Sequence, residues 1–225
     1  MLSAACETRT AAERGAELFS DPSLSPAATN TVACSDCHSP GDVPPDRILA
    51  GGSLRNVVGR PSYWAGEERE LRDAVNACLR FFMRHPDAAG LGPDDPRGLD
   101  LFAYLETLGA EPADAVAFTV PRVVATDGYP VGDGAAGQAT YVAACLVCHG
   151  AASTGEGRRS AFPPVIPTET IDEHGEFARD IVLNKIRHGG FYGIGGDMPP
   201  FSMETLTDAQ VGDLLTFFGL PPAAP

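Results

Sequence analysis

Two short cysteine motifs carry the clearest chemistry in this sequence. In each, two cysteines are separated by two residues and followed at once by a histidine: Cys34-Ser-Asp-Cys37-His38 and Cys145-Leu-Val-Cys148-His149. Two thiols at this spacing reach the two vinyl groups on one edge of a porphyrin, and the adjacent histidine can bind the iron. The pattern therefore predicts two covalently bound haem c groups, attached through the four cysteines and ligated by the two histidines.

A redox-active dithiol, a zinc site and structural disulfides are the competing interpretations. A redox dithiol needs no histidine after its second cysteine, yet both copies of the motif have one. A four-cysteine zinc site would have to join Cys37 and Cys148 across 111 residues and would leave both histidines without a role. Haem attachment accounts for both cysteines and the histidine of each motif.

Charge and hydropathy narrow the class of protein. The 225 residues include 16 Lys+Arg and 30 Asp+Glu, which gives a formal net charge of −14. Such a balance argues against a nucleic-acid partner, because binding phosphate requires a basic face. An acidic surface can instead steer a basic redox protein towards the molecule. No apolar run approaches the roughly 20 residues that span a bilayer, so no transmembrane segment is expected.

A sixth ligand decides whether a haem carries electrons or reacts with substrate. In the second half, Met198 lies in Asp-Met-Pro-Pro, where the prolines stiffen the chain. We expect Met198 to bind the iron beside His149. Met203 is the alternative, and its other interpretation is a hydrophobic residue near the next helix.

The first half offers two sulfur ligands. Met83 follows His38 by 45 residues, comparable with the 49 residues between His149 and Met198. We expect Met83 to be the ligand, because it lies where the middle helix ends and the chain turns. Cys78 is the alternative. A thioether favours Fe(II) and raises the potential, whereas a thiolate favours Fe(III) and lowers it.

Helical patterns repeat around the two motifs. A helix with glycine and, four residues later, an aromatic precedes each motif, and a helix with leucine and, three residues later, an aromatic ends each half: Gly15/Phe19, Gly137/Tyr141, Leu101/Tyr104 and Leu214/Phe217. Residues at these spacings share a helix face. We therefore expect the first and last helices of each half to cross closely at the glycine.

Terminal signals place several helix boundaries. Asp95-Pro96 starts the last helix of the first half, and Thr207 with Gln210 forms a capping box at the start of the final helix. Middle helices are expected near residues 68–83 and 176–188.

This order of elements resembles the class I cytochrome c fold over most of both halves. The resemblance implies an all-α fold of two tandem domains, each made of a few short helices and long loops around one haem. The expected boundaries are 1–117 for the first domain, 118–132 for a linker and 133–225 for the second domain. As in many class I members, a proline carbonyl would accept the second N–H of each haem histidine: Pro163 or Pro164 for His149, and Pro44 or Pro45 for His38.

Two segments of the first half resemble enzymes. Residues 15–25 with 34–40 look like the opening of bacterial dihaem cytochrome c peroxidases and methylamine-utilisation proteins. Leu71-Arg-Asp-Ala-Val-Asn-Ala-Cys78 is similar to the segment that supplies a thiolate to haem in thiosulfate dehydrogenases. The expected function is single-electron transfer between redox partners. The alternative is a dihaem enzyme of either kind, with the first haem as its active site.

The family resemblance also implies a location. Haem c is attached outside the cytoplasm, so a periplasmic or other extracytoplasmic protein is expected. Leu2-Ser-Ala-Ala-Cys6 resembles the end of a bacterial lipoprotein signal, which would make Cys6 a site of lipid attachment. The alternative is a free thiol on a frayed terminus.

Overall fold

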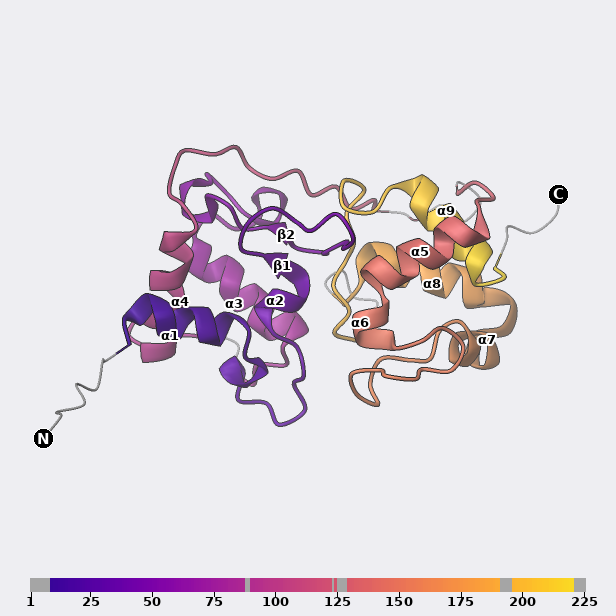
Figure 1. Ribbon diagram of the computed structural model, residues 1–225, viewed down its shortest axis with the longest axis horizontal. Helices are drawn as coiled ribbons and strands as arrows, with labels where there is room; N and C mark the ends of the chain where they lie inside the picture. The colour runs from indigo at the N-terminus through magenta and orange to yellow at the C-terminus, as the bar shows by residue number, and fades with distance from the viewer. Residues whose placement is uncertain (1–8, 88–89, 123, 125–128, 191–195, 221–225) are drawn as a thin grey trace, which may run out of the picture. The chain divides into compact units, whose positions relative to one another are not determined.

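The computed structural model describes residues 9–87, 90–122, 124, 129–190 and 196–220 (Figure 1). Their regular secondary structure is mostly helical, with little strand, which confirms the predicted all-α class. The α-helices are α1 Ala11–Phe19, α2 Cys34–Cys37, α3 Leu71–Phe82, α4 Pro96–Thr107, α5 Gly134–Ala144, α6 Leu146–His149, α7 Thr168–His174, α8 Ala178–His188 and α9 Asp208–Phe217. The 3₁₀ turns are η1 Pro22–Leu24, η2 Val57–Gly59, η3 Trp64–Gly66 and η4 Gly175–Phe177. Two short strands, β1 His38–Ser39 and β2 Gly52–Ser53, pair in parallel.

The chain forms two compact units. Unit 1 contains residues 1–35 and 54–115, and unit 2 contains residues 36–53 and 116–225. The sequence-based boundaries assign residues 36–53 to the first domain, whereas in the structure these residues are part of unit 2, with the second half of the chain. The Ile48 N–H donates to the Ala143 carbonyl at 3.0 Å, and Ala50 is part of the unit 2 core.

In unit 1, helices α1 and α4 cross side by side (Figure 1). A Cβ on Gly15 would collide with the Asp100 carbonyl, so only glycine allows this approach. Phe19 and Tyr104 meet at the crossing, with ring centroids 5.5 Å apart. The Arg14 guanidinium donates twice to the Asp100 carboxylate, at 2.7 and 2.6 Å. The predicted close crossing is confirmed here.

Unit 2 repeats this arrangement with α5 and α9. A Cβ on Gly137 would collide with the Asp213 carbonyl, and the rings of Tyr141 and Phe217 lie 5.8 Å apart. The core behind them is formed by α8, α9 and the loop between them, with Leu183, Val211 and other buried aliphatic residues. The second predicted crossing is therefore confirmed as well.

The helix caps follow the sequence closely. Thr207 and Gln210 form both bonds of a capping box at the start of α9, and the Asp95 carboxylate accepts from the Arg97 N–H at the start of α4. Helix α3 begins at Leu71 rather than near residue 68. Helix α7 was not predicted: it is only seven residues long, and its N-cap, Pro167, makes no side-chain cap bond.

Candidate functional site

The second cysteine motif lies where two helices of unit 2 meet. Cys145 is the C-cap of α5, and α6 then carries Cys148 and His149. Tyr141 holds this junction, because its hydroxyl donates to the Gly150 carbonyl at 2.8 Å. Burial raises the pKa of Tyr141, so the phenol stays protonated as a donor. The two thiols and the imidazole are thereby fixed on one short helical turn.

His149 is prepared as a metal ligand. The side chain is 8% exposed, and its Nδ1 is 2.9 Å from the Pro164 carbonyl. Burial lowers the pKa of His149, while the Pro164 carbonyl acts in the opposite direction. A neutral ring that donates Nδ1–H to a carbonyl presents Nε2 for a metal. Of the two prolines considered from sequence, Pro164 makes the bond.

The direction of the pKa shifts of these two thiols does not favour a redox dithiol. Burial raises the pKa of Cys145 to about 12, and the neighbouring Cys148 adds to the rise. Burial also raises the pKa of Cys148. Reactive dithiols need at least one cysteine with a lowered pKa, because the thiolate is the nucleophile. Protonated thiols beside a neutral imidazole instead fit covalent attachment of a haem that the imidazole ligates.

The backbone around Met198 is held against the end of α8. The Gly190 N–H donates to the Met198 carbonyl at 2.8 Å, and the Phe201 N–H donates to Ile186 at 2.8 Å. Gly189 has a φ of +54°, and a Cβ there would collide with the Met198 carbonyl. The Met198 side chain packs against the unit 2 core. The helix end and the glycine pair together set the position of this methionine.

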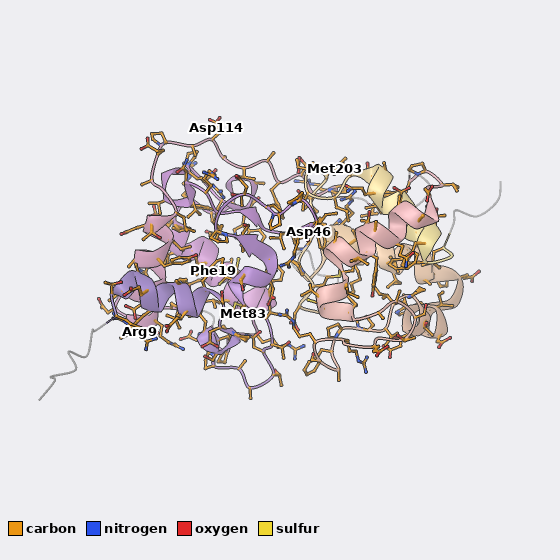
Figure 2. All side chains as sticks on the ribbon, viewed as in Figure 1. Arg9, Phe19, Asp46, Met83, Asp114 and Met203 are labelled. Atoms are coloured by element: carbon orange, nitrogen blue, oxygen red, sulfur yellow. The ribbon has the colours of Figure 1, made fainter. Side chains whose placement is uncertain are left out.

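Met203, the alternative, is oriented differently. The residue, which is labelled in Figure 2, is 38% exposed. Its N–H donates to the Thr119 carbonyl at 2.9 Å. If Met203 is instead a hydrophobic residue near the next helix, as the sequence also suggested, it is not a buried one. Of the two methionines, Met198 is the one in contact with the core.

A buried arginine that sequence reasoning missed secures the same loop. Arg187, on α8, is fully buried. Its guanidinium donates to three carbonyls, one hydroxyl and one carboxylate, those of Phe201, Ser202, Leu206, Tyr129 and Asp208. All of these groups except the Tyr129 hydroxyl belong to residues that follow Met198-Pro-Pro. The only sequence signal is an arginine inside an otherwise apolar stripe of α8, which does not reveal its partners.

The first cysteine motif is a short helix followed by a strand. Helix α2 contains Cys34 and Cys37, and His38 begins β1, where it pairs with Gly52. The Gly51 N–H donates to the Cys37 carbonyl at 2.8 Å. A Cβ on Gly51 would overlap the His38 ring, so the ring lies directly on the backbone of that glycine. The bond predicted between His38 and Pro44 or Pro45 stays a prediction.

An ion pair joins the segments of the two motifs within unit 2. The Arg159 guanidinium donates with both terminal nitrogens to the Asp36 carboxylate, with Nη2 at 2.6 Å from Oδ1. Asp36 lies between the cysteines of the first motif. The Arg159 N–H donates to the carbonyl of Cys148, in the second motif, at 3.1 Å.

The sulfur candidates of the first half both belong to unit 1. Met83, which is labelled in Figure 2, is 3% exposed. It lies in the core cluster of that unit, together with Leu54, Val57, Leu79, Leu91, Leu101 and Leu105. Cys78 is half-buried on α3 and is not a member of that cluster. Neither ligand assignment is tested by these positions. Cys6 lies outside the described residues.

Comparison with known proteins agrees with this chemistry. Residues 132–218 match the family model described as cytochrome c oxidase, cbb3-type, subunit III. Cys145, Cys148 and His149 lie within this match, and their chemistry fits covalently bound haem c. The chain is also 29% identical, over 200 residues, to a thiosulfate dehydrogenase from Allochromatium vinosum. That alignment covers 84% of this chain and 68% of the relative. Among the described residues, no helix is long and apolar enough to cross a membrane.

Proposed function

We propose that the chain is a dihaem c-type cytochrome that transfers single electrons between redox partners and between its own two haems. The observation that carries this proposal is the composition of unit 2. This unit contains the matched cytochrome c domain together with Asp36, Cys37 and His38 of the first motif. Two haem-binding segments joined by an ion pair favour electron transfer from one haem to the other.

In the second haem, His149 and Met198 are the proposed iron ligands. The Pro164 carbonyl orients the imidazole. The backbone hydrogen bonds at the end of α8 hold the methionine loop. A haem held by both His149 and Met198 would have no position left for a substrate and would favour the reduced iron, as an electron carrier requires. Met198→Ala should abolish the methionine–iron charge-transfer band and lower the potential of that haem, whereas Met203→Ala should do neither. The reverse result would transfer the assignment to Met203.

The haem count is tested by intact mass. The denatured protein should exceed the polypeptide mass by two haems, because thioether bonds survive denaturation. Cys37→Ser combined with His38→Ala should remove one haem, and the equivalent changes at Cys148 and His149 should remove the other. A mass with one haem in the wild type would overturn the dihaem proposal.

A second candidate function is the oxidation of thiosulfate at the first haem. Two observations favour it: the alignment with a thiosulfate dehydrogenase covers most of this chain, and Val75-Asn-Ala-Cys78 lies on one turn of α3. In this function Cys78 would be the sixth ligand, and the haem would be low in potential. In the carrier function Met83 takes that place and the potential is higher.

One pair of variants separates these functions. Electron paramagnetic resonance of the oxidised protein distinguishes thiolate from thioether ligation. If Met83 is the ligand, Met83→Ala changes the first haem's signal and Cys78→Ser leaves it nearly unchanged. If Cys78 is the ligand, the pattern reverses, and thiosulfate should reduce the wild type much faster than Cys78→Ser. That second result would refute the electron-carrier function and favour oxidation of thiosulfate.

The proposed location is outside the cytoplasm, where haem c is attached. The proposed partners are redox proteins with a basic face that complements the net charge of −14. The rate of electron transfer between this protein and such a partner should fall as the salt concentration rises, because screening weakens the attraction between the acidic and basic surfaces. A lipid on Cys6 is proposed as a membrane anchor, and mass spectrometry of the N-terminal peptide tests it.

A further inference from the structure

The contact between Asp36 and Arg159 connects the two haem-attachment segments directly. Asp36 lies on α2 between the attachment residues Cys34 and Cys37, and Arg159 is bonded through its backbone to Cys148. Asp36, Cys37, Cys148 and Arg159 all belong to unit 2. A short path of covalent and hydrogen bonds therefore runs from the first motif, through this ion pair, to the second.

The pair is less exposed than the ion pair made by the adjacent arginine. The side chains of Arg159 and Asp36 are 21% and 16% exposed, and both oxygens of the carboxylate are used. By contrast, the adjacent Arg158 reaches Glu169 at 3.6 Å, with 33% and 50% of those side chains exposed. A bidentate, partly desolvated arginine–carboxylate pair fixes orientation as well as distance.

Backbone hydrogen bonds hold the loop that carries Arg159 in a defined position. The Ala151 N–H donates to the Glu156 carbonyl at 2.8 Å, which turns the chain back immediately after the second motif. The Arg159 N–H then returns to the Cys148 carbonyl. This hairpin-like return leaves little freedom for the arginine backbone, so the guanidinium is directed by structure already formed around the second motif.

We propose that the Asp36–Arg159 ion pair couples the two haems, by fixing the separation of their attachment segments and by providing the bonded route between them. This inference rests on the proposed dihaem function. The step it serves moves one electron from a ferrous haem to a ferric haem, which become ferric and ferrous respectively. No proton or further reactant is needed, because the ion pair is neither oxidised nor reduced. Asp36 and Arg159 are thus positioning residues that leave the iron ligands unchanged.

The test measures electron transfer between the haems in the loaded, full-length protein. One electron is introduced by flash photoreduction, and its redistribution is followed at wavelengths where the two haems differ. Asp36→Asn and Arg159→Gln should each slow redistribution by about tenfold or more, because small displacements of reacting centres have large effects on rate. Visible and electron paramagnetic resonance spectra of each haem should remain those of the wild type.

Two further variants separate pairing from general disturbance. Arg158→Gln removes the neighbouring charge from the same loop and should leave the rate unchanged. Asp36→Glu keeps the carboxylate and should retain most of the rate. An equal loss in Asp36→Glu and Asp36→Asn would assign the effect to packing of α2 and overturn the inference.

The outcomes also distinguish this inference from the function on which it rests. A wild-type mass with fewer than two haems would refute the dihaem function itself. Two haems with wild-type redistribution rates in both Asp36→Asn and Arg159→Gln would refute only the role of the ion pair. A variant that loses a haem on replacement of either residue would show a role in haem loading instead and would also overturn the inference.

Discussion

Replacing Arg187 with glutamine should destabilise unit 2 strongly. The guanidinium is fully buried, and its removal leaves the carbonyls of Phe201, Ser202 and Leu206 without their donor. Breaking a buried charged network by removing one partner costs about 3–5 kcal/mol. The remaining carboxylate, Asp208, is 45% exposed and can be hydrated, which places the expected loss near the lower end, at about 3 kcal/mol.

The assay is urea unfolding of the haem-loaded protein, followed by far-ultraviolet circular dichroism. With a slope of about 2 kcal/mol per molar urea, the unfolding midpoint should fall by about 1.5 M. The methionine–iron band should weaken before global unfolding, because Arg187 holds the segment after Met198. Arg14→Gln, which removes a partly exposed arginine from a bidentate pair, is the control and should shift the midpoint much less. An Arg187→Gln midpoint equal to that of the wild type would refute the reasoning.

Two other substitutions test local geometry and charge. Gly189→Ala and Gly175→Ala each force a residue into a positive φ near +54°, which strains the backbone by about 1–3 kcal/mol. Gly189→Ala should destabilise more and should also weaken the Met198 band, because its Cβ collides with the Met198 carbonyl, whereas nothing lies within 4 Å of a Cβ on Gly175. Burial would raise the pKa of Glu204, but hydrogen bonds from Thr119 outweigh burial and lower it to about 2. Glu204 therefore contributes stability that is present above its ordinary pKa of 4.5 and is lost as the pH falls towards 2. Glu204→Gln should flatten the acid side of the stability profile, as measured by urea midpoints from pH 5 to pH 2; an unchanged slope there would contradict this assignment.

The sequence was informative wherever the signal is local. The capping box at Thr207 depends on residues three positions apart, and the glycine–aromatic pairs depend on residues four positions apart. Each pattern needs only the geometry of one helix. The crossings that place Gly15 against α4 and Gly137 against α9 followed from these patterns, since a glycine on an apolar face has few other uses.

Long-range polar contacts could not be predicted in this way. Arg187 bonds to groups between 14 and 58 residues away, and Arg159 bonds to Asp36 across 123 residues. An arginine in a helix is more often a solvated surface residue, and no spacing rule distinguishes the buried exception. Only the folded backbone shows that carbonyls converge on one guanidinium. The two residues that secure the methionine loop and the motif segments were therefore invisible to pattern analysis.

The grouping of residues 36–53 with unit 2 also depends on long-range contacts, which local sequence patterns do not reveal. The internal repeat suggests that the chain divides between its halves, because each half has its own motif and its own pair of crossing helices. However, the last carbonyls of a helix need donors from outside it. In α5 the Ala143 carbonyl finds one in the Ile48 N–H, and Ala50 adds apolar contact with the core behind it. A helix end in the second half is thus completed by a loop from the first. The spatial unit that contains the second haem motif consequently includes the histidine of the first motif, and a division drawn from repeats alone would separate groups that the fold keeps together.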